Sequence, residues 1–441
     1  MAKIVNLNAA GIDISSKDYY VAVSEEKLKR DVVVFGAFTE DLHKIAKHLQ
    51  NHGVETVAME STGVYWCELY TVLLDYNIEV YLVNAKYVKN VPGRKSDVSD
   101  ARWLQKLHSY GLLNASFQPD NITRTLRSHV RVRKQITQSM STEIQRMQKS
   151  LELMNIKLNN VIRDITGKTG IKIIESIISG ERNPKKLSQH RDKRMKASRE
   201  IIEKSLNGHW REEQLFNLSL AYEHYLFLRD QMIKCDNEIE KIMINMSDDT
   251  VPEKKTKKTI IRKNTPTFDV AQYIYNATGV ELTEIYGIKG TIALTVFSET
   301  GANIKEKFPT DKQFVRWLNL VPDNKITGGK VISSKVKKRK NKAGQAFKSA
   351  ANTLWKAQNP LADDLRRRKA KNGAGKAIVA IAKKLATIYY KMITEKVAFN
   401  PELLIQNSHK YHKDRIEYFE KALQRAKLKE SGSFSSIGTT G

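Results

Sequence analysis

The feature that most constrains the fold is an apolar segment near the start of the chain that carries a single acidic residue. Residues 5–16 read VNLNAAGIDISS, so Asp13 stands between Ile12 and Ile14. An ionised carboxylate in an apolar setting is costly to desolvate, and such a residue is usually paired or bound to a metal ion. The segment therefore predicts an interior strand whose acidic residue has a function.

The chain up to about residue 115 alternates strand and helix patterns. After the first strand, KDYYVAVSE and DVVVFGAF predict two strands joined to it as hairpins. The expected elements that follow are a helix at 41–53, a strand at 55–62, a helix at 66–77, a strand at 78–85 and a helix at 96–111. This order indicates an α/β domain with a mixed sheet, in which ligands bind at the carboxyl ends of the strands.

Three further acidic residues accompany Asp13. Glu60 closes the strand TVAME, and Asp97 and Asp100 lie three apart at the start of a helix, so their carboxylates face the same side. Each of these two aspartates alone could be a helix-start acid favoured by the helix dipole, with Ser96 as the N-cap. Together the four oxygen ligands suit Mg²⁺ or Mn²⁺, and a pair of such ions could support phosphodiester cleavage.

The composition points to a polyanionic partner. The chain has 441 residues, and its 75 Lys and Arg outnumber 48 Asp and Glu, which gives a formal net charge of +27. Nucleic acid is the commonest partner at such an excess. No apolar run approaches the roughly 20 residues that a membrane-spanning helix needs, and MAKIVNLNAAG lacks the apolar core of a signal peptide. Cys67 and Cys235 lie far apart, so neither a zinc site nor a disulfide framework is expected, which suits a reducing cytoplasm.

Long helices are expected from about residue 123 to 246. One apolar series has the alternating spacings of four and three that are typical of a heptad seam; it comprises Met140, Ile144, Met147, Leu151, Met154, Leu158 and Val161. A second series comprises Leu228, Met232, Cys235, Ile239, Ile242 and Met246. The seams predict a coiled-coil arm that dimerises; packing of the two helices within one subunit remains the alternative.

The rest of the chain predicts a mainly α domain. A charged segment with two prolines, SDDTVPEKKTKKTIIRKNTPT, is expected to be a linker. In LTEIYGIKGTIALTVFSETG, Gly287 to Gly290 form a turn between two helical patterns, which resembles a helix-hairpin-helix and could meet a phosphate. The expected divisions are 1–118 for the metal-dependent domain, 119–246 for the arm, 247–267 for the linker, 268–398 for the C-terminal domain, and 399–441 for an appended helix and a disordered tail.

Two clusters of basic residues are expected to contact nucleic acid. The densest lies in a Gly/Ser/Lys-rich loop with little acid nearby, and such residues neutralise the phosphate backbone without reading sequence; it comprises Lys330, Lys335, Lys337, Lys338, Arg339, Lys340 and Lys342. A second cluster, which includes Arg127 and Arg131, begins the helical arm. A solvated loop is the alternative for the first cluster.

Several motifs together resemble one known family. GIDISSK, AMESTGVYW and GRKSDVSDARWL resemble the RuvC/RNase H-like DEDD domain of an insertion-sequence transposase family that includes the Piv/MooV-type DNA invertases. LTEIYGIKGTIALTVFSETG and WLNLVPDNKITGGKV resemble that family's C-terminal transposase domain, and the likeness covers about residues 5–165 and 280–390. By position, the family's four acids correspond to Asp13, Glu60, Asp97 and Asp100.

The resemblance implies a recombinase that moves or inverts DNA in a bacterial cytoplasm, associated with the nucleoid when bound. It further implies an element-encoded guide RNA, a homodimer that assembles to a tetramer, and a serine of the C-terminal domain that forms a covalent link to DNA. The alternatives are a RuvC-like metal-dependent nuclease or junction resolvase, and a catalytically inactive nucleic-acid-binding relative.

The sequence departs from the family at the expected nucleophile. The serine that precedes the two glycines of the family's motif is Thr327 here. Threonine keeps the hydroxyl, but its extra methyl group hinders attack and restricts the rotamer. Thr327 is the first candidate for the nucleophile, and Ser333 or Ser334 could replace it; otherwise the serine-type step is impaired.

Overall fold

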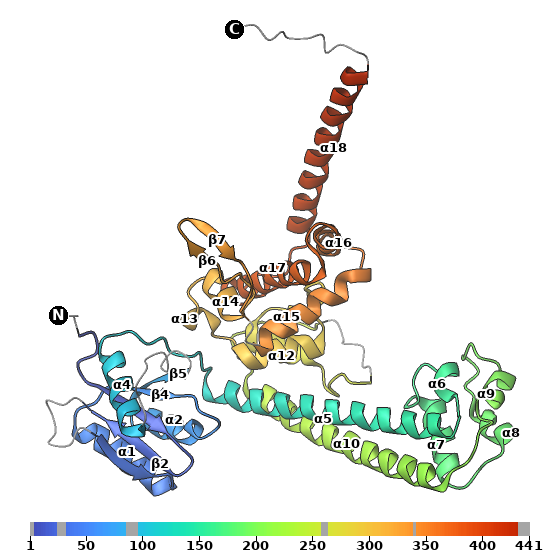
Figure 1. Ribbon diagram of the computed structural model, residues 1–441, viewed down its shortest axis with the longest axis horizontal. Coiled ribbons are helices and arrows are strands. Elements are labelled where there is room, and N and C mark those ends of the chain that lie inside the picture. The colour runs from blue at the N-terminus through green and yellow to red at the C-terminus, as the bar shows by residue number, and fades with distance from the viewer. Residues whose placement is uncertain (1–3, 24–31, 85–95, 257–262, 338–340, 431–441) are drawn as a thin grey trace. The chain divides into compact units, whose positions relative to one another are not determined.

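A mixed sheet forms the centre of the first part of the chain in the computed structural model (Figure 1). Its five strands, in the order β3-β2-β1-β4-β5, are β1 (Ala9–Ile14), β2 (Asp18–Ala22), β3 (Val32–Gly36), β4 (Thr56–Glu60) and β5 (Glu79–Val83). Strands β1, β2 and β3 pair antiparallel, whereas β1, β4 and β5 pair parallel. The predicted mixed sheet is thereby confirmed.

The structure describes residues 4–23, 32–84, 96–256, 263–337 and 341–430, without the side chains of 406–412 and 428–430. The chain divides into two compact units, Met1–Gln118 and Pro119–Gly441.

Helices cover both faces of the sheet in the first unit. Helices α1 (Thr39–Asn51) and α2 (Trp66–Asp75) bury their apolar residues in one core with the side chains of Ile12, Val57 and other strand residues. Helix α4 (Asp97–Ser109) packs on the opposite face, where Leu104 meets Ala58 and Val83. In α1 the buried residues recur at helical spacing, as its sequence pattern predicts.

Two long antiparallel helices begin the second unit. They are α5 (Asn121–Leu153) and α10 (Glu212–Asn245), which lie side by side in Figure 1. The sulfhydryl of Cys235 donates to the carbonyl of His129, and Glu143 pairs with His224. Residue numbers therefore rise along α5 where they fall along α10, so the two helices are antiparallel. We call this helix pair the arm.

The predicted seams are only partly continuous. In the second seam, Met232, Cys235 and Ile239 are buried on α10 as expected. The first seam was expected to run on through Leu158 and Val161, but α5 ends at Leu153 and Asn155 has φ +59°. Leu158 is still buried, because it turns back into the same core from a separate short helix.

Short helices cap the arm. They are α6 (Leu158–Val161), α7 (Lys168–Ile178), α8 (Pro184–Leu187) and α9 (Arg199–Ser205), with a 3₁₀ turn at Ser188–His190. Buried residues of α7 and α9 join those of α5 and α10 in one apolar cluster. The cap is thus part of the arm's own core.

The remainder of the second unit is mainly helical. Its elements are α11 (Val270–Thr278), α12 (Gly290–Thr300), α13 (Ile304–Lys307), α14 (Asp311–Trp317), the hairpin β6 (Lys325–Thr327) and β7 (Lys330–Ser333), α15 (Lys342–Thr353), α16 (Pro360–Asn372), α17 (Ala374–Glu395) and α18 (Glu402–Glu430), with 3₁₀ turns at Leu282–Glu284 and Leu354–Lys356. Tyr389 of α17 is fully buried, and its hydroxyl lies 2.9 Å from that of Thr300 at the end of α12.

The segments at the edges of this region were expected to be irregular. Residues 252–256 of the predicted linker pack on α11 instead, since Tyr275 donates to the carbonyl of Pro252 and the backbone N–H of Thr256 donates to the side chain of Gln272. Backbone and hydroxyl contacts to a neighbouring helix can order a segment whose composition builds no core of its own. The predicted tail from residue 431 onward lies outside the described residues.

The predicted turn at Gly287 follows a 3₁₀ turn rather than a full helix. Gly287 has φ +81°, and a Cβ there would lie 2.7 Å from the carbonyl oxygen of Ala350 on α15. Only glycine fits both constraints. None of the helices in the described ranges has the length and apolar character that crossing a bilayer needs.

Candidate metal centre and nucleic-acid interface

Asp13 and Glu60 lie at the carboxyl ends of neighbouring parallel strands. The register of β1 and β4 pairs Ile12 with Met59, so the next residues along, Asp13 and Glu60, are also neighbours. Residues at equivalent positions of a parallel pair point to the same face of the sheet. Asp13 is half-buried and Glu60 is buried.

Helix α4 brings the other two acids to this edge. It runs antiparallel to β1 at close range, because the carbonyl of Ser109 accepts from Val5, Gln105 donates to the carbonyl of Ala9, and a Cβ on Gly11 would lie 2.5 Å from the carbonyl oxygen of Ala101. Continuing this series brings the first turn of α4 over the end of β1. That first turn carries the acids predicted from sequence.

Asp97 and Asp100 occupy that turn, and Ser96 caps it. The hydroxyl of Ser96 accepts from the backbone N–H of Ser99 at 3.3 Å, as the sequence predicts for an N-cap. Asp97 is exposed and Asp100 half-buried. The absence of a side chain at Gly11 is what lets the helix approach the strand so closely.

The electrostatics of Asp13 record that the four carboxylates are near one another. Burial raises the pKa of Asp13 to about 6, and the negative charges of Glu60, Asp97 and Asp100 add to the rise. Clustered carboxylates that destabilise each other's charge are the donor set that a hard divalent cation prefers. The residues present therefore fit Mg²⁺ or Mn²⁺.

The four carboxylates lie at one edge of the sheet but do not converge closely. Within the described part of the chain, no group of three or more His, Cys, Asp or Glu side chains is close enough to hold a metal ion as it stands. Mutual repulsion, which the raised pKa of Asp13 reflects, works against a tighter cluster of charges. Glu60 also accepts a hydrogen bond from the hydroxyl of Thr62 at 3.5 Å.

The candidate nucleophile lies in the second unit, on a hairpin. Thr327 ends β6 and pairs with Lys330 across a two-residue turn. Gly328 and Gly329 have φ +53° and +74°, the pair of positive values that a type I′ turn requires. Thr327 is exposed, Ser333 on β7 is half-buried, and Ser334 is exposed.

The basic loop predicted to meet nucleic acid is described in part. Lys330, Lys335 and Lys337 are exposed on or beside the same hairpin. Lys338, Arg339 and Lys340 lie outside the described residues. Lys342 is exposed in the first turn of α15, where Asn341 is the N-cap.

The arginines of the arm's first turns differ in their contacts. Arg131 forms a bidentate pair with Glu299, with N···O distances of 2.9 and 2.8 Å, so its guanidinium is engaged within the protein. Arg127 is half-buried on α5. Partial desolvation lowers the pKa of Lys342, and the charges of Arg131 and Arg127 lower it further. These side chains therefore form one positive region across α5 and α15.

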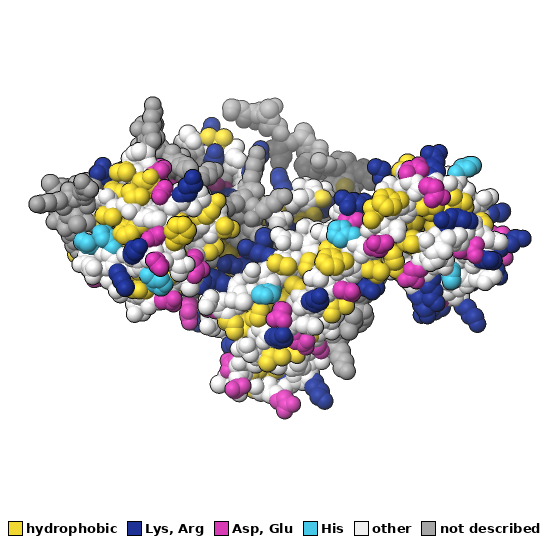
Figure 2. Space-filling view, turned by 90° about the horizontal axis from the view of Figure 1, so that it is seen from below, with side chains coloured by type: hydrophobic (Ala, Val, Ile, Leu, Met, Phe, Trp, Pro, Cys, Tyr) yellow, Lys and Arg dark blue, Asp and Glu magenta, His cyan; other side chains and the backbone are white. Residues whose placement is uncertain are grey.

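The structure also groups basic residues outside the two clusters expected from the sequence. At the cap of the arm, a cavity of about 430 Å³ is lined by Lys168, Lys172, Arg191, Lys193 and Arg194 among others. Figure 2 shows Lys and Arg side chains gathered at that far end of the arm, on the right. The signal was present in the basic stretch QHRDKRMKASR, but sequence spacing does not bring its residues beside α7.

Comparisons with known proteins agree with this arrangement. Residues 10–156 match a family model described as a transposase, of the DEDD type found in IS110 elements, and residues 280–365 match the model described as "Transposase IS116/IS110/IS902 family". The first match spans the four acids and the start of the arm, and the second spans the hairpin that carries Thr327. No curated protein shows significant similarity to the chain.

Proposed function

The chain belongs to the IS110/IS116 family of insertion-sequence transposases, and from this premise we propose that it cuts and rejoins DNA with two sites on separate units. The first is a divalent-metal site at Asp13, Glu60, Asp97 and Asp100. The second is the hydroxyl of Thr327. The family implies a DNA substrate, a RuvC-like fold for the first unit and a general dependence on divalent metal.

One observation carries the proposal: the register of β1 and β4 makes Asp13 and Glu60 neighbours, and α4 runs back along β1 so that its first turn, with Asp97 and Asp100, reaches the same edge of the sheet. A fold that needed only a stable sheet edge would gain nothing from four like charges there. A cation would relieve their repulsion. Bound Mg²⁺ or Mn²⁺ would supply Lewis-acid activation of the scissile phosphate and stabilise charge on the oxygens that enter and leave.

The residues of the first unit would position that chemistry. Asp13 and Glu60 offer oxygens from rigid strand ends, and Asp97 and Asp100 offer theirs from the first turn of a helix. Sites built on strands and helices hold their geometry better than sites on loops. The half-buried Asp13 and buried Glu60 also limit competing water on the sheet side.

The hydroxyl of Thr327 would exchange one phosphoester for another. Its Oγ1 forms a bond to phosphorus while the bond from phosphorus to a deoxyribose oxygen breaks, and the hydroxyl proton is transferred to the departing oxygen. The reverse reaction with a different DNA hydroxyl rejoins the strand, so no external energy source is needed. The exposed position of Thr327 at the end of a hairpin suits an approach to a phosphate.

The remaining features of the proposal concern partners. A guide RNA encoded by the element, together with DNA, would contact the basic surfaces of the hairpin and the arm, and the net charge of +27 supports such a load of polyanion. A homodimer that assembles to a tetramer would have to use other faces of the arm, because the seam residues of α5 and α10 are buried against each other within one chain. In that assembly the acids of one subunit could work with Thr327 of another.

The experiment is an adduct assay. Purified protein, element-end DNA, transcribed flanking RNA and Mg²⁺ are mixed, denatured and examined for DNA-linked protein. The adduct is expected with the wild type and with Thr327→Ser, and is expected to vanish with Thr327→Ala and with Asp13→Asn. Asp75→Asn, which neutralises an exposed acid at the end of α2, serves as the matched control and should leave the adduct intact.

The outcomes separate the candidate nucleophiles. An adduct that survives Thr327→Ala but is lost with Ser333→Ala or Ser334→Ala would move the nucleophile along the same loop. Omission of Mg²⁺ should abolish the adduct, and Mn²⁺ should restore it. An adduct that forms in the presence of a chelator would refute the metal site.

The threonine itself supports a second candidate function. If the methyl group of Thr327 blocks the covalent step, the four acids alone would make the protein a RuvC-like metal-dependent nuclease. That activity predicts cleavage that depends on Asp13 and metal, without a covalent adduct in any variant. A protein that binds nucleic acid but neither cleaves it nor forms an adduct would be an inactive relative.

A further inference from the structure

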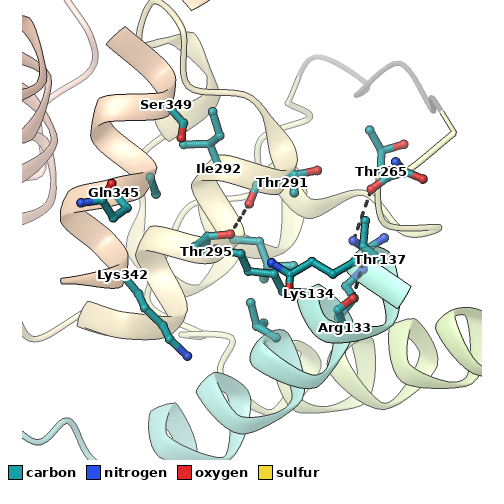
Figure 3. Close-up of a pocket in the computed structure, with 15 residues that line it drawn as sticks. Arg133, Lys134, Thr137, Thr265, Thr291, Ile292, Thr295, Lys342, Gln345 and Ser349 are labelled. Atoms are coloured by element: carbon teal, nitrogen blue, oxygen red, sulfur yellow. Dashed lines mark hydrogen bonds between the residues drawn. The ribbon is translucent and has the colours of Figure 1, made fainter. Parts of the chain in front are cut away.

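A cavity of about 460 Å³ lies within the second unit, at the base of the arm. Its walls come from α5, from the segment at residues 264–265, and from the facing helices α12 and α15 (Figure 3). The volume falls within the range of about 300–1,000 Å³ that is typical of pockets for small ligands. Neither the metal site nor the hairpin nucleophile uses this cavity.

A buried ion pair borders the cavity. The guanidinium of Arg133 on α5 pairs with the carboxylate of Asp236 on α10, and both side chains are almost fully buried. Arg133 also donates to the carbonyl of Asn264 at 3.2 Å, and the N–H of Thr267 donates to Asp236 at 3.2 Å. These bonds fix the segment that forms one wall, so the pocket exists before any ligand arrives.

The rim of the cavity is positively charged. Lys134 extends from α5 and Lys342 from the first turn of α15, and both are exposed (Figure 3). Partial desolvation of its ammonium group lowers the pKa of Lys342, and so do the charges of Arg131, Lys134 and Arg127, whereas Glu299 opposes them. A lysine in the first turn of a helix is also placed against the helix dipole. This concentration of positive charge does not stabilise the fold, but it would attract an anion to the rim.

The interior combines apolar walls with amide and hydroxyl groups. Val130, Ile292 and Leu294 supply apolar surface, and Gln138 and Gln345 supply amides that can both donate and accept. The hydroxyl of Thr295 donates to the carbonyl of Thr291 at 2.7 Å, which leaves its oxygen as an acceptor. A nucleobase has the matching character, since its faces are apolar and its edge carries donors and acceptors.

We propose that this cavity receives one unpaired nucleotide of a bound nucleic-acid strand, with the base inside and its phosphate between Lys134 and Lys342. The assignment rests on the proposed function, because the strand belongs to the transposase's DNA or RNA. A plain contact with the backbone of a duplex would use the lysines but would need no cavity behind them. The cavity therefore adds selection for an extruded base to general attraction for phosphate.

The test uses the full-length protein and duplex probes with and without a single bulged nucleotide. DNA and RNA versions of each probe are compared by fluorescence anisotropy at one fixed salt concentration. The wild type is expected to bind the bulged probe roughly tenfold or more tightly than the flush one, on the scale of one stacked base. A 2-aminopurine at the bulge should brighten on binding as it leaves the stack.

Two kinds of variant separate the base from the phosphate. Ser349→Trp adds a large side chain at an exposed residue that lines the cavity, and should abolish the preference for the bulge while leaving affinity for the flush duplex unchanged. Asn352→Trp makes the same change at an exposed position of α15 that does not line the cavity, and should keep the preference. Lys342→Gln should weaken the binding of both probes, and its control is Lys348→Gln on the same helix.

The outcomes are kept distinct from those of the adduct assay. Asp13→Asn should lose the adduct but retain the preference for the bulge, so failure of the proposed chemistry does not imply failure of the pocket. Equal affinity of the wild type for bulged and flush probes, or a preference that survives Ser349→Trp, would overturn the proposal. A nucleoside monophosphate that binds more tightly than the bulged strand, and loses binding in Ser349→Trp, would overturn the strand as the source and leave a free nucleotide.

Discussion

Gly11 offers the sharpest test of how the first unit positions its acids. A Cβ at this position would lie 2.2 Å from the backbone nitrogen of Gln105 and 2.5 Å from the carbonyl oxygen of Ala101, both on α4. Ordinary van der Waals contact begins near 3.4 Å, so Gly11→Ala requires the helix to retreat by about 1.2 Å. Backbone atoms cannot rotate aside as the end of a side chain can.

The expected loss follows from that displacement. Overpacking of this kind costs about 1–3 kcal/mol of stability, and we expect the upper part of that range because three backbone atoms of α4 block the methyl group. The retreat carries Asp97 and Asp100 away from Asp13, although all four acids remain in the sequence. A misplacement of about 1 Å at a reacting centre can reduce the rate about 100-fold, so metal-dependent DNA cleavage should fall by that order.

The assay combines hydrogen exchange with cleavage. Exchange of the backbone amides of α4 reports its local opening free energy in the full-length protein, and cleavage is measured in parallel. Gly36→Ala is the matched control, because the new Cβ would meet only the carboxylate end of Asp41, at 2.5 Å, which can move aside. Wild-type exchange in α4 together with wild-type cleavage in Gly11→Ala would refute the role given to this contact.

Three further predictions concern stability. Burial lowers the pKa of His108 from about 6.5 to about 4, so the unfolded state takes up a proton first as the pH falls. The contribution of neutral His108 to the free energy of unfolding is therefore fully present above pH 6.5, and roughly 3 kcal/mol of it should be lost as the pH drops to 4. Hydrogen exchange of α4 should show this loss in the wild type but not in His108→Gln. Asp236→Ala leaves Arg133 charged, buried and unpaired, and should cost about 3–5 kcal/mol in urea unfolding, whereas the double change Arg133→Met with Asp236→Leu should recover most of it. Gly287→Ala combines φ +81° with a Cβ 2.7 Å from the carbonyl oxygen of Ala350, and should lower the melting temperature of the second unit by an amount equivalent to about 2 kcal/mol or more.

The sheet of the first unit was predictable because its sequence patterns are local and unambiguous. Each expected strand overlaps an observed one, and Ser96 caps α4 as its sequence predicts. The period-2 and helical patterns agree with the turn residues between them, so few alternative topologies remain. The predicted first strand, from Val5 to Ser16, was longer than the observed Ala9–Ile14 because apolar residues extend beyond the paired ones.

The break in the arm was not predictable from spacing. Apolar residues at heptad positions continue through Leu158, yet the helix stops at Leu153. Asn155 adopts φ +59°, which asparagine tolerates better than most residues, and the chain turns back into the same core. A seam indicates which residues are buried, but it does not reveal whether one helix or two bury them.

The pocket at the base of the arm shows a different limit. Lys134, Asn264, Thr291 and Lys342 belong to four segments that are far apart in the chain, and no motif joins them. The sequence identified Lys342 only as one member of a basic run. Lys342 differs from the rest of that run because the folded structure places it near cationic side chains of α5.

If Thr327 is the nucleophile, its methyl group would hinder the reaction mainly by restricting the rotamers of its own side chain. A Cβ built on Gly328 or Gly329 would meet no atom within 4 Å, so the turn beside Thr327 is open on the side of the glycines. Thr327 is itself exposed, so the main effects expected of its extra methyl group are on the choice of χ1 and on crowding at the attacked phosphate. A nucleophile on an open hairpin can be re-aimed by small movements of the turn.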